Sequence, residues 1–263
     1  MIVTGASSGI GKALAEEGLA RGMRVVLAAR NTEAMKAIAY ASGSDAKNFL
    51  VVKTDVGNRD DCSNLVERTI EKFGSIDILV NNAGISMRAL FEQADLSVLE
   101  RLMQINFWGA VYCTHYALPW LLKSKGTVAG VSSIAGYKGL PARTGYSASK
   151  FALQGFLESL RIENRKKGLH VLIACPGFTA SNIRTTALAG DGSAQGESPR
   201  DESSMMQARE VARHILRSIE KKKHRLILTG QGKLTVVLNK LFPRLVDGLV
   251  YNHMAAEPDS PFK

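Results

Sequence analysis

The sequence predicts an α/β fold in which a doubly wound parallel sheet carries helices on both faces, with a lid segment and a C-terminal helical extension. Short apolar runs, in which Val, Ile and Leu occupy consecutive positions, alternate with longer amphipathic stretches. Consecutive apolar residues suit strands that are buried on both faces of a parallel sheet. Strands that alternate with helices form right-handed β-α-β crossovers. No fixed-period repeat and no Pro-rich linker interrupts the pattern, so residues 1–263 are predicted to form one domain.

The elements follow one another in a regular order along the chain. The predicted strands are 2–4, 24–29, 49–53, 76–81, 127–132, 170–175 and 225–229. The predicted helices are 10–21, 32–42, 58–73, 96–123, 147–167 and 208–223. Parallel strands end at one edge of the sheet, and that edge is where α/β sheets bind ligands. We therefore look for functional side chains directly after the strands.

One long polar stretch, residues 178–207, lies outside this alternation. A loop of this length in a compact domain is usually a functional lid. Its larger apolar residues indicate a moderately apolar substrate, although methionine also fills ordinary cores. These residues are Phe178, Ile183, Leu188, Met205 and Met206.

A second segment outside the alternation, residues 233–251, is apolar. Its leucines recur at intervals of three and four and so share one face of a helix; they are Leu234, Leu238, Leu241, Leu245 and Leu249. Pro243 does not fit an unstrained helix interior, so we predict two short helices, with Pro243 opening the second. Residues 257–263 are predicted to form a polar tail.

Two interpretations of the apolar face on residues 233–251 remain open. In the first, it packs on its own domain or across a homodimer. In the second, it docks on an anionic membrane as a peripheral contact. Basic residues favour the second interpretation; they are Lys233, Lys240, Arg244 and the run Lys221-Lys222-Lys223. That run is also explained as a solvated helix end, where cations suit the helix dipole.

The composition is that of an ordinary globular protein, with 45% hydrophobic and 22% charged residues. A chain of this length buries a full core, which excludes disorder, collagen-like repeats and a disulfide scaffold. The 34 Lys and Arg outnumber the 24 acids, giving a formal net charge of +10. That excess suits a phosphate-bearing ligand, an anionic surface, a nucleic acid or simply a basic surface. No recognised nucleic-acid module is present, so no nucleic-acid partner is expected.

The cysteine pattern and the N-terminus indicate a cytoplasmic location. Cys62, Cys113 and Cys175 are widely spaced and form no C-x-x-C pair, so we expect reduced thiols and neither a metal site nor a disulfide framework. No apolar run approaches the length of a membrane span, and no signal peptide opens the chain. Met1 lies almost inside the first predicted strand, which leaves room for a few more residues before it in the natural chain.

A glycine-rich turn follows the first predicted strand and reads Gly5-Ala6-Ser7-Ser8-Gly9-Ile10-Gly11. Glycines here permit a tight turn and a close backbone approach to a pyrophosphate, and the next helix offers free N–H groups and a positive dipole end. The spacing is G-x-x-x-G-x-G rather than G-x-G-x-x-G. Three glycines can also mark a turn alone, but their place at the first strand-to-helix junction favours a dinucleotide site.

The end of the second predicted strand indicates which cofactor is bound. NAD binders carry an acid there for the adenosine ribose hydroxyls, whereas this chain reads Arg30-Asn31 with no acid before Glu33. An arginine can meet a 2′-phosphate with a planar fork of donors. We therefore expect NADP(H) in preference to NAD(H), with Arg30 and Asn31 at the cofactor.

A candidate proton-transfer pair lies at the start of the helix predicted at 147–167. Tyr146 and Lys150 are four residues apart and share a helix face. A neighbouring ammonium favours the phenolate and lowers a tyrosine pKa from its ordinary value near 10. Such pairs also arise by chance, so the context must decide.

Two further positions supply that context. Ser132 and Ser133 close a buried strand, where a hydroxyl can bond a substrate carbonyl as negative charge develops on its oxygen, although serines there are often turn residues. Asn106 lies in an apolar helical run, where a polar amide is costly unless it is bonded. It either distorts or caps the helix, or holds a water in a proton relay.

Together these residues resemble the short-chain dehydrogenase/reductase family, in its single-domain Rossmann-type branch. The matching motifs run from Thr4 to about Thr179. They are Thr4-Gly5-x-x-x-Gly9-x-Gly11, Asp55-Val56, Asn81-Asn82-Ala83-Gly84, Ser133 with Tyr146-x-x-x-Lys150, and Pro176-Gly177.

The resemblance implies a role for each matching residue. Tyr146 would exchange the proton, Lys150 would hold the nicotinamide ribose and lower the tyrosine pKa, and Ser133 would bond the substrate oxygen. Asn106 would organise a relay water. Further cofactor contacts are implied at Asp55, Val56, Asn82, Ala83, Gly84, Pro176, Gly177 and Thr179. No metal is implied.

The resemblance implies an NADP(H)-dependent oxidoreductase that interconverts a carbonyl and a secondary alcohol, as a homodimer or homotetramer. One departure is Ser8, where many NADP(H)-using members carry a basic residue, so the cofactor preference depends on Arg30. The alternative is a non-catalytic NADP(H)-binding sensor or scaffold. Such relatives usually lose the tyrosine, lysine or serine, and this chain keeps all three. The substrate is not identified by any motif.

Overall fold

Seven parallel strands form the central sheet, in the order β3-β2-β1-β4-β5-β6-β9. The computed structural model describes residues 1–197, 205–257 and 260–262. The strands are β1 Ile2–Thr4, β2 Val25–Ala29, β3 Phe49–Lys53, β4 Ile78–Asn81, β5 Thr127–Val131, β6 His170–Cys175 and β9 Arg225–Ile227. The chain runs outward from β1 to β3 and then returns to β4, so β1 and β4 flank the topological switch point. The predicted doubly wound α/β fold is confirmed.

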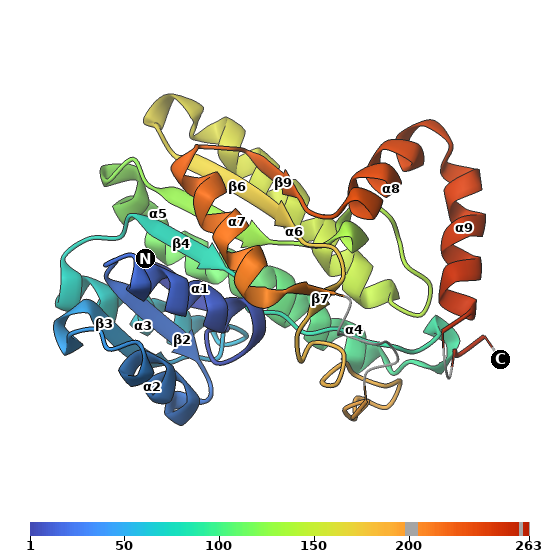
Figure 1. The fold of residues 1–263 in the computed structure, drawn as a ribbon, viewed down its shortest axis with the longest axis horizontal. Coiled ribbons are helices and arrows are strands. Elements are labelled where there is room, and N and C mark those ends of the chain that lie inside the picture. The colour runs from blue at the N-terminus through green and yellow to red at the C-terminus, as the bar shows by residue number, and fades with distance from the viewer. Residues whose placement is uncertain (198–204, 258–259, 263) are drawn as a thin grey trace.

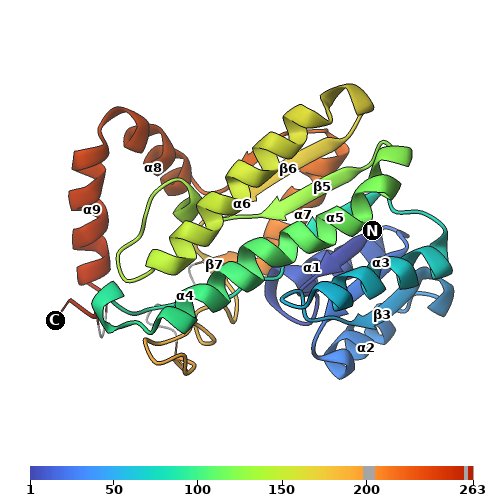
Figure 2. The same ribbon diagram turned by 180° about the vertical axis from the view of Figure 1, so that it is seen from behind.

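Helices cover both faces of the sheet (Figures 1 and 2). The helices are α1 Gly9–Ala20, α2 Thr32–Ala41, α3 Arg59–Phe73, α4 Leu96–Met103, α5 Gly109–Lys123, α6 Thr144–Glu163, α7 Ala208–Glu220, α8 Gly230–Leu241 and α9 Pro243–Ala255. Because apolar residues occupy consecutive positions in the strands, they pack against the helices on both faces of the sheet. Val3 and Leu27 pack in one core with α1, α2 and α7, while Ile2 and Val26 pack in the other with α3, α5 and α6.

The long helix predicted at 96–123 is divided by a π-helical turn at Gln104–Trp108, between α4 and α5. Apolar residues continue through this turn, so the hydrophobic pattern alone does not distinguish it from an α-helix. The helix predicted from residue 147 begins at Thr144, which places Tyr146 in its first turn. The strand predicted to end at Ser132 ends at Val131, so both serines follow β5.

The described part of the lid segment contains regular structure. Its ends form two short parallel strands, β7 Thr179–Ala180 and β8 Met206–Gln207. Leu188 bridges to Met87 and to Ala194, which fastens the segment beside the turn before α4. Residues 198–204 of the predicted lid lie outside the described residues.

The C-terminal segment forms the two helices predicted, α8 and α9, with Pro243 in the first turn of α9. They stand as a hairpin beyond the carboxyl ends of the strands (Figure 1). The hairpin is tied to the loop after β5, where Asn239 Nδ2 donates to the carbonyl of Tyr137 and Lys138 pairs with Asp247. Among the described residues, no helix is long and apolar enough to cross a bilayer.

The polar tail expected at residues 257–263 is partly buried where the structure describes it. Glu257 is buried and pairs with Arg88 at 3.4 Å. Ser260 is buried as well, and its hydroxyl donates to the carbonyl of Met254. These contacts fold the described part of the tail back against α9 and the turn before α4.

Candidate active site

A cavity of about 750 Å³ opens at the carboxyl ends of the strands. It is bounded by the glycine-rich turn, by the segments after β2 to β6 and by the lid. All of the predicted cofactor residues except Gly11 line it, and so do three of the four predicted catalytic residues. These lining residues are Gly5, Ser7, Ser8, Gly9, Ile10, Arg30, Asn31, Asp55, Val56, Asn82, Ala83, Gly84, Ser133, Tyr146, Lys150, Pro176, Gly177 and Thr179.

The glycine-rich turn depends on positions that carry no Cβ. Gly5 and Gly9 have φ angles of +66° and +52°, in the left-handed region. Gly11 does not line the cavity, but a Cβ there would lie 2.2 Å from the carbonyl oxygen of Gly5. Ser8 precedes α1 and its side chain makes no capping hydrogen bond. The N-terminus of α1 therefore faces the cavity with an anion-binding geometry.

The turn is joined to the segment after β4 across the switch point. The Thr4 hydroxyl accepts hydrogen bonds from the backbone N–H groups of Asn82 and Ala83, at 3.0 and 3.1 Å. Asn82 Nδ2 in turn donates to the carbonyl of Thr4 at 2.9 Å. A Cβ on Gly5 would lie 2.9 Å from Cα of Ala83. The two segments thus form one rigid floor.

The segments after β2 and β3 form the opposite end of the cavity. The Arg30 side chain is exposed, whereas the Asn31 side chain caps α2 by accepting from the N–H of Ala34. Asp55 Oδ1 accepts from the N–H of Gly57 at 2.9 Å. Asn31 and Asp55 therefore shape local turns here in addition to lining the cavity.

Ser133, Tyr146 and Lys150 meet on one wall of the cavity. Lys150 is 3% exposed, and its Nζ donates to the carbonyl of Val131 at 3.0 Å. Nζ lies 5.6 Å from the centre of the Tyr146 ring. Burial lowers the pKa of Lys150 to about 8. The sequence expectation that these three side chains share a site is consistent with this geometry.

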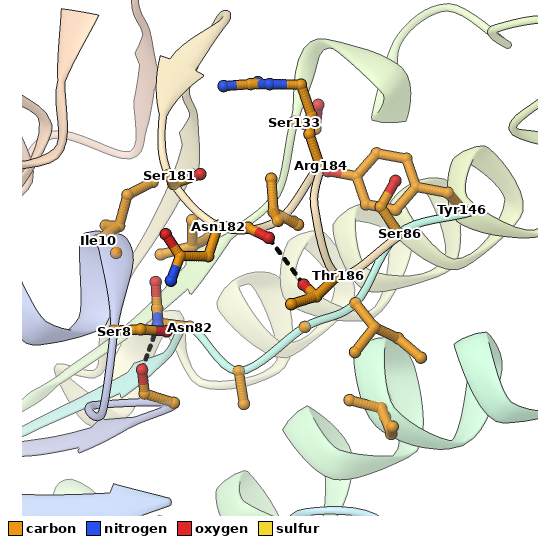
Figure 3. Close-up of a pocket in the computed structure, with 18 of the residues that line it drawn as sticks. Ser8, Ile10, Asn82, Ser86, Ser133, Tyr146, Ser181, Asn182, Arg184 and Thr186 are labelled. Atoms are coloured by element: carbon orange, nitrogen blue, oxygen red, sulfur yellow. Dashed lines mark hydrogen bonds between the residues drawn. The ribbon is translucent and has the colours of Figure 1, made fainter. Parts of the chain in front are cut away.

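The two serines after β5 have different surroundings. The Ser133 hydroxyl accepts from the N–H of Ala135 and lines the cavity (Figure 3). The Ser132 hydroxyl is buried, where it donates to the carbonyl of Lys150 and accepts from Gln154. Both serines line the cavity, but the Ser132 hydroxyl already has a donor and an acceptor partner within the protein, so the role of Ser133 stays the prediction that this geometry favours.

The electrostatics of Tyr146 differ from the sequence expectation. Burial is the largest influence and raises its pKa above 10, while the Ser133 side chain and the charges of Arg143 and Arg184 oppose the rise. Cys175 adds to it. The charges of these two arginines therefore act on the phenol together with the Lys150 ammonium beside its ring.

Asn106 lies in the π-helical turn and does not line the cavity. Its Nδ2 donates to the carbonyl of Ile85 and to the Ser149 hydroxyl, both at 2.9 Å, and its Oδ1 accepts from the N–H of Ile85. Both amide hydrogens are thus used, and one acceptor position on Oδ1 remains. Its water-relay role stays a prediction.

Several cavity residues carried no signal in the sequence. Ser86, Arg143 and Arg184 line the cavity and are buried. In the lid, the Thr186 hydroxyl donates to the carbonyl of Asn182 (Figure 3). Only their positions identify them: one follows β4, one precedes α6 and the others lie on the lid. No spacing rule marks such residues in advance.

The apolar lid residues are divided between two environments. Phe178, Ile183 and Leu188 line the cavity. Met206 instead packs against the core on the α1 face of the sheet. Within the described residues, no group of three or more His, Cys, Asp and Glu is placed to hold a metal ion.

Cysteines are separate from the cavity lining. Cys62, Cys113 and Cys175 are free thiols and buried. Burial raises the pKa of the Cys175 thiol to about 11, which keeps it protonated at neutral pH.

Comparison with known proteins gives consistent matches along the chain. The family model described as short chain dehydrogenase matches residues 1–191. The dehydrogenase/reductase SDR family protein 7-like of Dictyostelium discoideum is 34% identical over 258 residues, 95% of this chain and 80% of that protein. The 11-beta-hydroxysteroid dehydrogenase A of Arachis hypogaea is 42% identical over 197 residues, 74% of this chain. This chain covers 55% of that relative, about half its length.

Solved structures share the fold along almost the whole chain. A short-chain dehydrogenase from Streptomyces avermitilis has a TM-score of 0.81 and 27% identity, with 96% of each chain covered. A short chain dehydrogenase/reductase from Burkholderia phymatum, solved in complex with NAD, has a TM-score of 0.82 and 23% identity, with 93% of each covered. An alcohol dehydrogenase from Thermococcus sibiricus, complexed with 5-hydroxy-NADP, has a TM-score of 0.73 and 23% identity, covering 86% of this chain and 92% of that one.

Proposed function

The chain belongs to the short-chain dehydrogenase/reductase family of oxidoreductases, and we propose that it uses NADP(H) to interconvert a carbonyl compound and a secondary alcohol, with Tyr146 as the acid and base. The observation that carries this proposal is the convergence of Ser133, Tyr146 and Lys150 in the cavity that the glycine-rich turn also lines. A cofactor held along the turn would lie in the same space as the proton-transfer group.

The chain's own residues fit a dinucleotide. The left-handed Gly5 and Gly9 and the N-terminus of α1, which has no side-chain capping hydrogen bond, form a cradle at the cavity that suits a pyrophosphate. Asp55 and Val56 would border the adenine, Asn82 to Gly84 would line the cofactor cleft, and Thr179 would bond the nicotinamide carboxamide. When bound, the nicotinamide would give or take the hydride.

The remaining steps belong to side chains of this chain. In reduction, Tyr146 donates its phenol proton to the developing alkoxide, and in oxidation its phenolate takes the proton from the alcohol. Ser133 donates a hydrogen bond to the same oxygen and stabilises its negative charge. Lys150 orients the cofactor ribose. It also connects Tyr146 to the proposed relay water at Asn106, through which the phenol regains its proton after reduction or loses it after oxidation.

NADP(H) is preferred in this proposal because Arg30 is the cation at the end of β2, and no acid occurs before Glu33. Arg30 is exposed and lines the cavity, so its guanidinium can approach a 2′-phosphate. Similar solved structures contain either NAD or an NADP derivative, so they do not distinguish the two cofactors. The proposed preference for NADP(H) in this protein therefore depends on Arg30.

The first test is a screen of the purified protein for NADPH oxidation with ketosteroids, ketoacyl thioesters and simple ketones. Ketosteroids are included because several relatives are named as 11-beta-hydroxysteroid dehydrogenases. Turnover with any class, lost in the Tyr146→Phe variant, supports the proposal. NADPH binding without turnover in all classes favours the sensor or scaffold alternative.

We also propose that the protein assembles as a homodimer or homotetramer in the cytoplasm and that the α8–α9 hairpin is its contact surface with a second copy or with a membrane. In the part of the chain that the structure describes, half of the exposed large apolar residues lie on this hairpin; they are Leu234, Val237, Leu241, Phe242, Leu245, Leu249 and Tyr251. Lys233, Lys240 and Arg244 on the same hairpin are exposed and supply positive charge for anionic lipid.

Two measurements separate these contacts. Sedimentation with acidic and neutral vesicles at low salt tests the membrane, and the membrane contact is wrong if the protein stays in the supernatant with acidic lipid. A shift from dimer to monomer in the Leu245→Lys variant would identify the hairpin as the subunit interface. An unchanged oligomer that also ignores vesicles would contradict both contacts.

A further inference from the structure

Two buried arginines share the cavity with Tyr146. Arg143 is the residue that precedes α6, three positions before Tyr146, and Arg184 belongs to the lid. They are 8% and 6% exposed. We propose that Arg143, with a smaller contribution from Arg184, is an electrostatic positioning residue whose permanent charge stabilises the Tyr146 phenolate. This inference rests on the proposed acid–base role of Tyr146.

The guanidinium of Arg143 is fixed in place. Its Nη1 donates to the Ser86 hydroxyl at 3.2 Å and to the carbonyl of Met87 at 3.3 Å. Met87 belongs to the small apolar cluster against which the Tyr146 ring packs. Arg143 is therefore held to the same wall that holds the ring, and its charge cannot move out to solvent without breaking these bonds.

Arg184 is held within the lid segment. Its Nη2 donates to the carbonyl of Thr179 at 2.7 Å. Thr179 is the residue that the family places beside the nicotinamide, and its backbone opens β7. The charge of Arg184 is thus carried by the lid segment, whereas that of Arg143 is carried by the residue before α6.

The other groups that face Tyr146 do not supply the same charge. Cys175, at the end of β6, opposes the phenolate, and the Ser133 side chain assists it as a neutral donor. Lys150 faces the Val131 carbonyl, and its pKa of about 8 means that its positive charge fades just above neutral pH. A guanidinium keeps its charge throughout this range. Arg143 and Arg184 both oppose the rise that burial causes in the pKa of Tyr146.

The test follows Tyr146 directly and needs no substrate. Protein labelled with ¹³C at tyrosine Cζ has six tyrosine signals, and the signal absent from Tyr146→Phe identifies Tyr146. Its chemical shift is followed upward from neutral pH in the NADP⁺-saturated wild type and in Arg143→Met. We expect the shift to begin about one pH unit higher in Arg143→Met. Only the onset is compared, so complete ionisation is not required.

Three variants separate charge from structure. Arg143→Lys keeps the charge and should keep the wild-type onset. Arg184→Met should move the onset in the same direction by less, and it tests the inference if Arg143→Met fails to fold. Arg161→Met removes a charge from the last turn of the same helix, 15 residues from Tyr146 and about 22 Å along the axis. That control should leave the onset unchanged.

Two results would overturn the inference. One is an identical or earlier onset in Arg143→Met and Arg184→Met. The other is a wild-type Tyr146 signal that does not move anywhere in the pH range where the protein stays folded. The arginines would then not lower the pKa of Tyr146 enough for the phenol to ionise in that range. Either result with an inactive Tyr146→Phe leaves the proposed function intact. An active Tyr146→Phe would instead remove the proposed function, whatever the arginines do.

Discussion

Thr4 and Asn82 are joined by two hydrogen bonds across the switch point of the sheet, one from the Asn82 backbone N–H to the Thr4 hydroxyl and one from the Asn82 amide to the Thr4 carbonyl. Thr4 is 1% exposed, and its hydroxyl also accepts from the N–H of Ala83. The last residue of β1 therefore determines where the segment after β4 lies. These hydrogen bonds hold together the two segments that form the floor beneath the proposed cofactor.

Thr4→Val should destabilise the protein by about 2–4 kcal/mol, because it leaves two backbone donors without their acceptor at nearly unchanged volume. Urea unfolding gives the free energy. Thr69→Val is the matched control, since Thr69 is buried but its hydroxyl only donates, to the carbonyl of Leu65 one helical turn back. An equal loss in the two variants would contradict this account of the floor.

Gly11→Ala should damage both folding and NADPH binding, because the new Cβ would lie 2.2 Å from the backbone oxygen of Gly5 and the turn would have to shift. Gly155→Ala is its counterpart inside α6, where a Cβ meets nothing within 4 Å. Alanine there should raise the free energy of unfolding by about 0.5–1 kcal/mol through helix propensity. Isothermal titration with NADPH and urea unfolding measure the two effects. Normal NADPH affinity in Gly11→Ala would show that the turn is not the phosphate site.

Lys150→Met should stabilise the cofactor-free protein at neutral pH, by about 1–3 kcal/mol after the lost hydrogen bond to Val131 is deducted. The pKa of Lys150 in the folded chain, about 8, lies below the lysine value of 10.5. Between these values the unfolded chain binds more protons, so the wild-type free energy of unfolding rises with pH in that window. The variant lacks this rise.

The gain in Lys150→Met should therefore shrink as the pH increases from about 8 towards 10.5. Urea unfolding of both proteins at several pH values gives the difference. Lys166→Met, at an exposed lysine, serves as the control for loss of one positive charge. A gain that does not change with pH would mean that the burial of the ammonium is not its cause.

Arg30→Ala should weaken NADPH binding by about 10- to 150-fold, the range of a charge-assisted contact to the 2′-phosphate. NADH lacks that phosphate and should bind both proteins alike. Fluorescence titration with each cofactor measures the four affinities. Equal losses for NADPH and NADH would place Arg30 away from the 2′-phosphate.

The fold was predictable because its signals are local. Buried parallel strands need consecutive apolar residues, and β2 with Val25–Ala29 provides five of them, all buried. The division of α8 from α9 follows from Pro243, whose fixed φ suits a first helical turn. The turn through Gly5 and Gly9 was predictable for the same reason, since it needs residues that tolerate positive φ.

The rest of the site depends on contacts between distant segments. Arg143 reaches the cavity wall through Ser86 and Met87, more than fifty residues earlier in the chain, and no local pattern contains that pairing. The π-helical turn was missed because Ile105, Phe107 and Trp108 continue the apolar run through it, so no polar break marks the change of helix type. Its reason is again distant, since Asn106 in that turn bonds both backbone groups of Ile85.

The central claim is that the Tyr146 phenol carries the proton in turnover, and Tyr146→Phe tests it most directly. The ring keeps its packing and loses only the hydroxyl, so NADPH affinity should stay nearly unchanged. The missing proton donor should destabilise only the transition state and so lower the rate of the chemical step. Single-turnover kinetics with a substrate from the carbonyl screen, beside NADPH titration of the same samples, measures both. We predict a loss of at least about 100-fold in kcat with intact NADPH binding. A variant that keeps about a tenth or more of the wild-type kcat would contradict the claim.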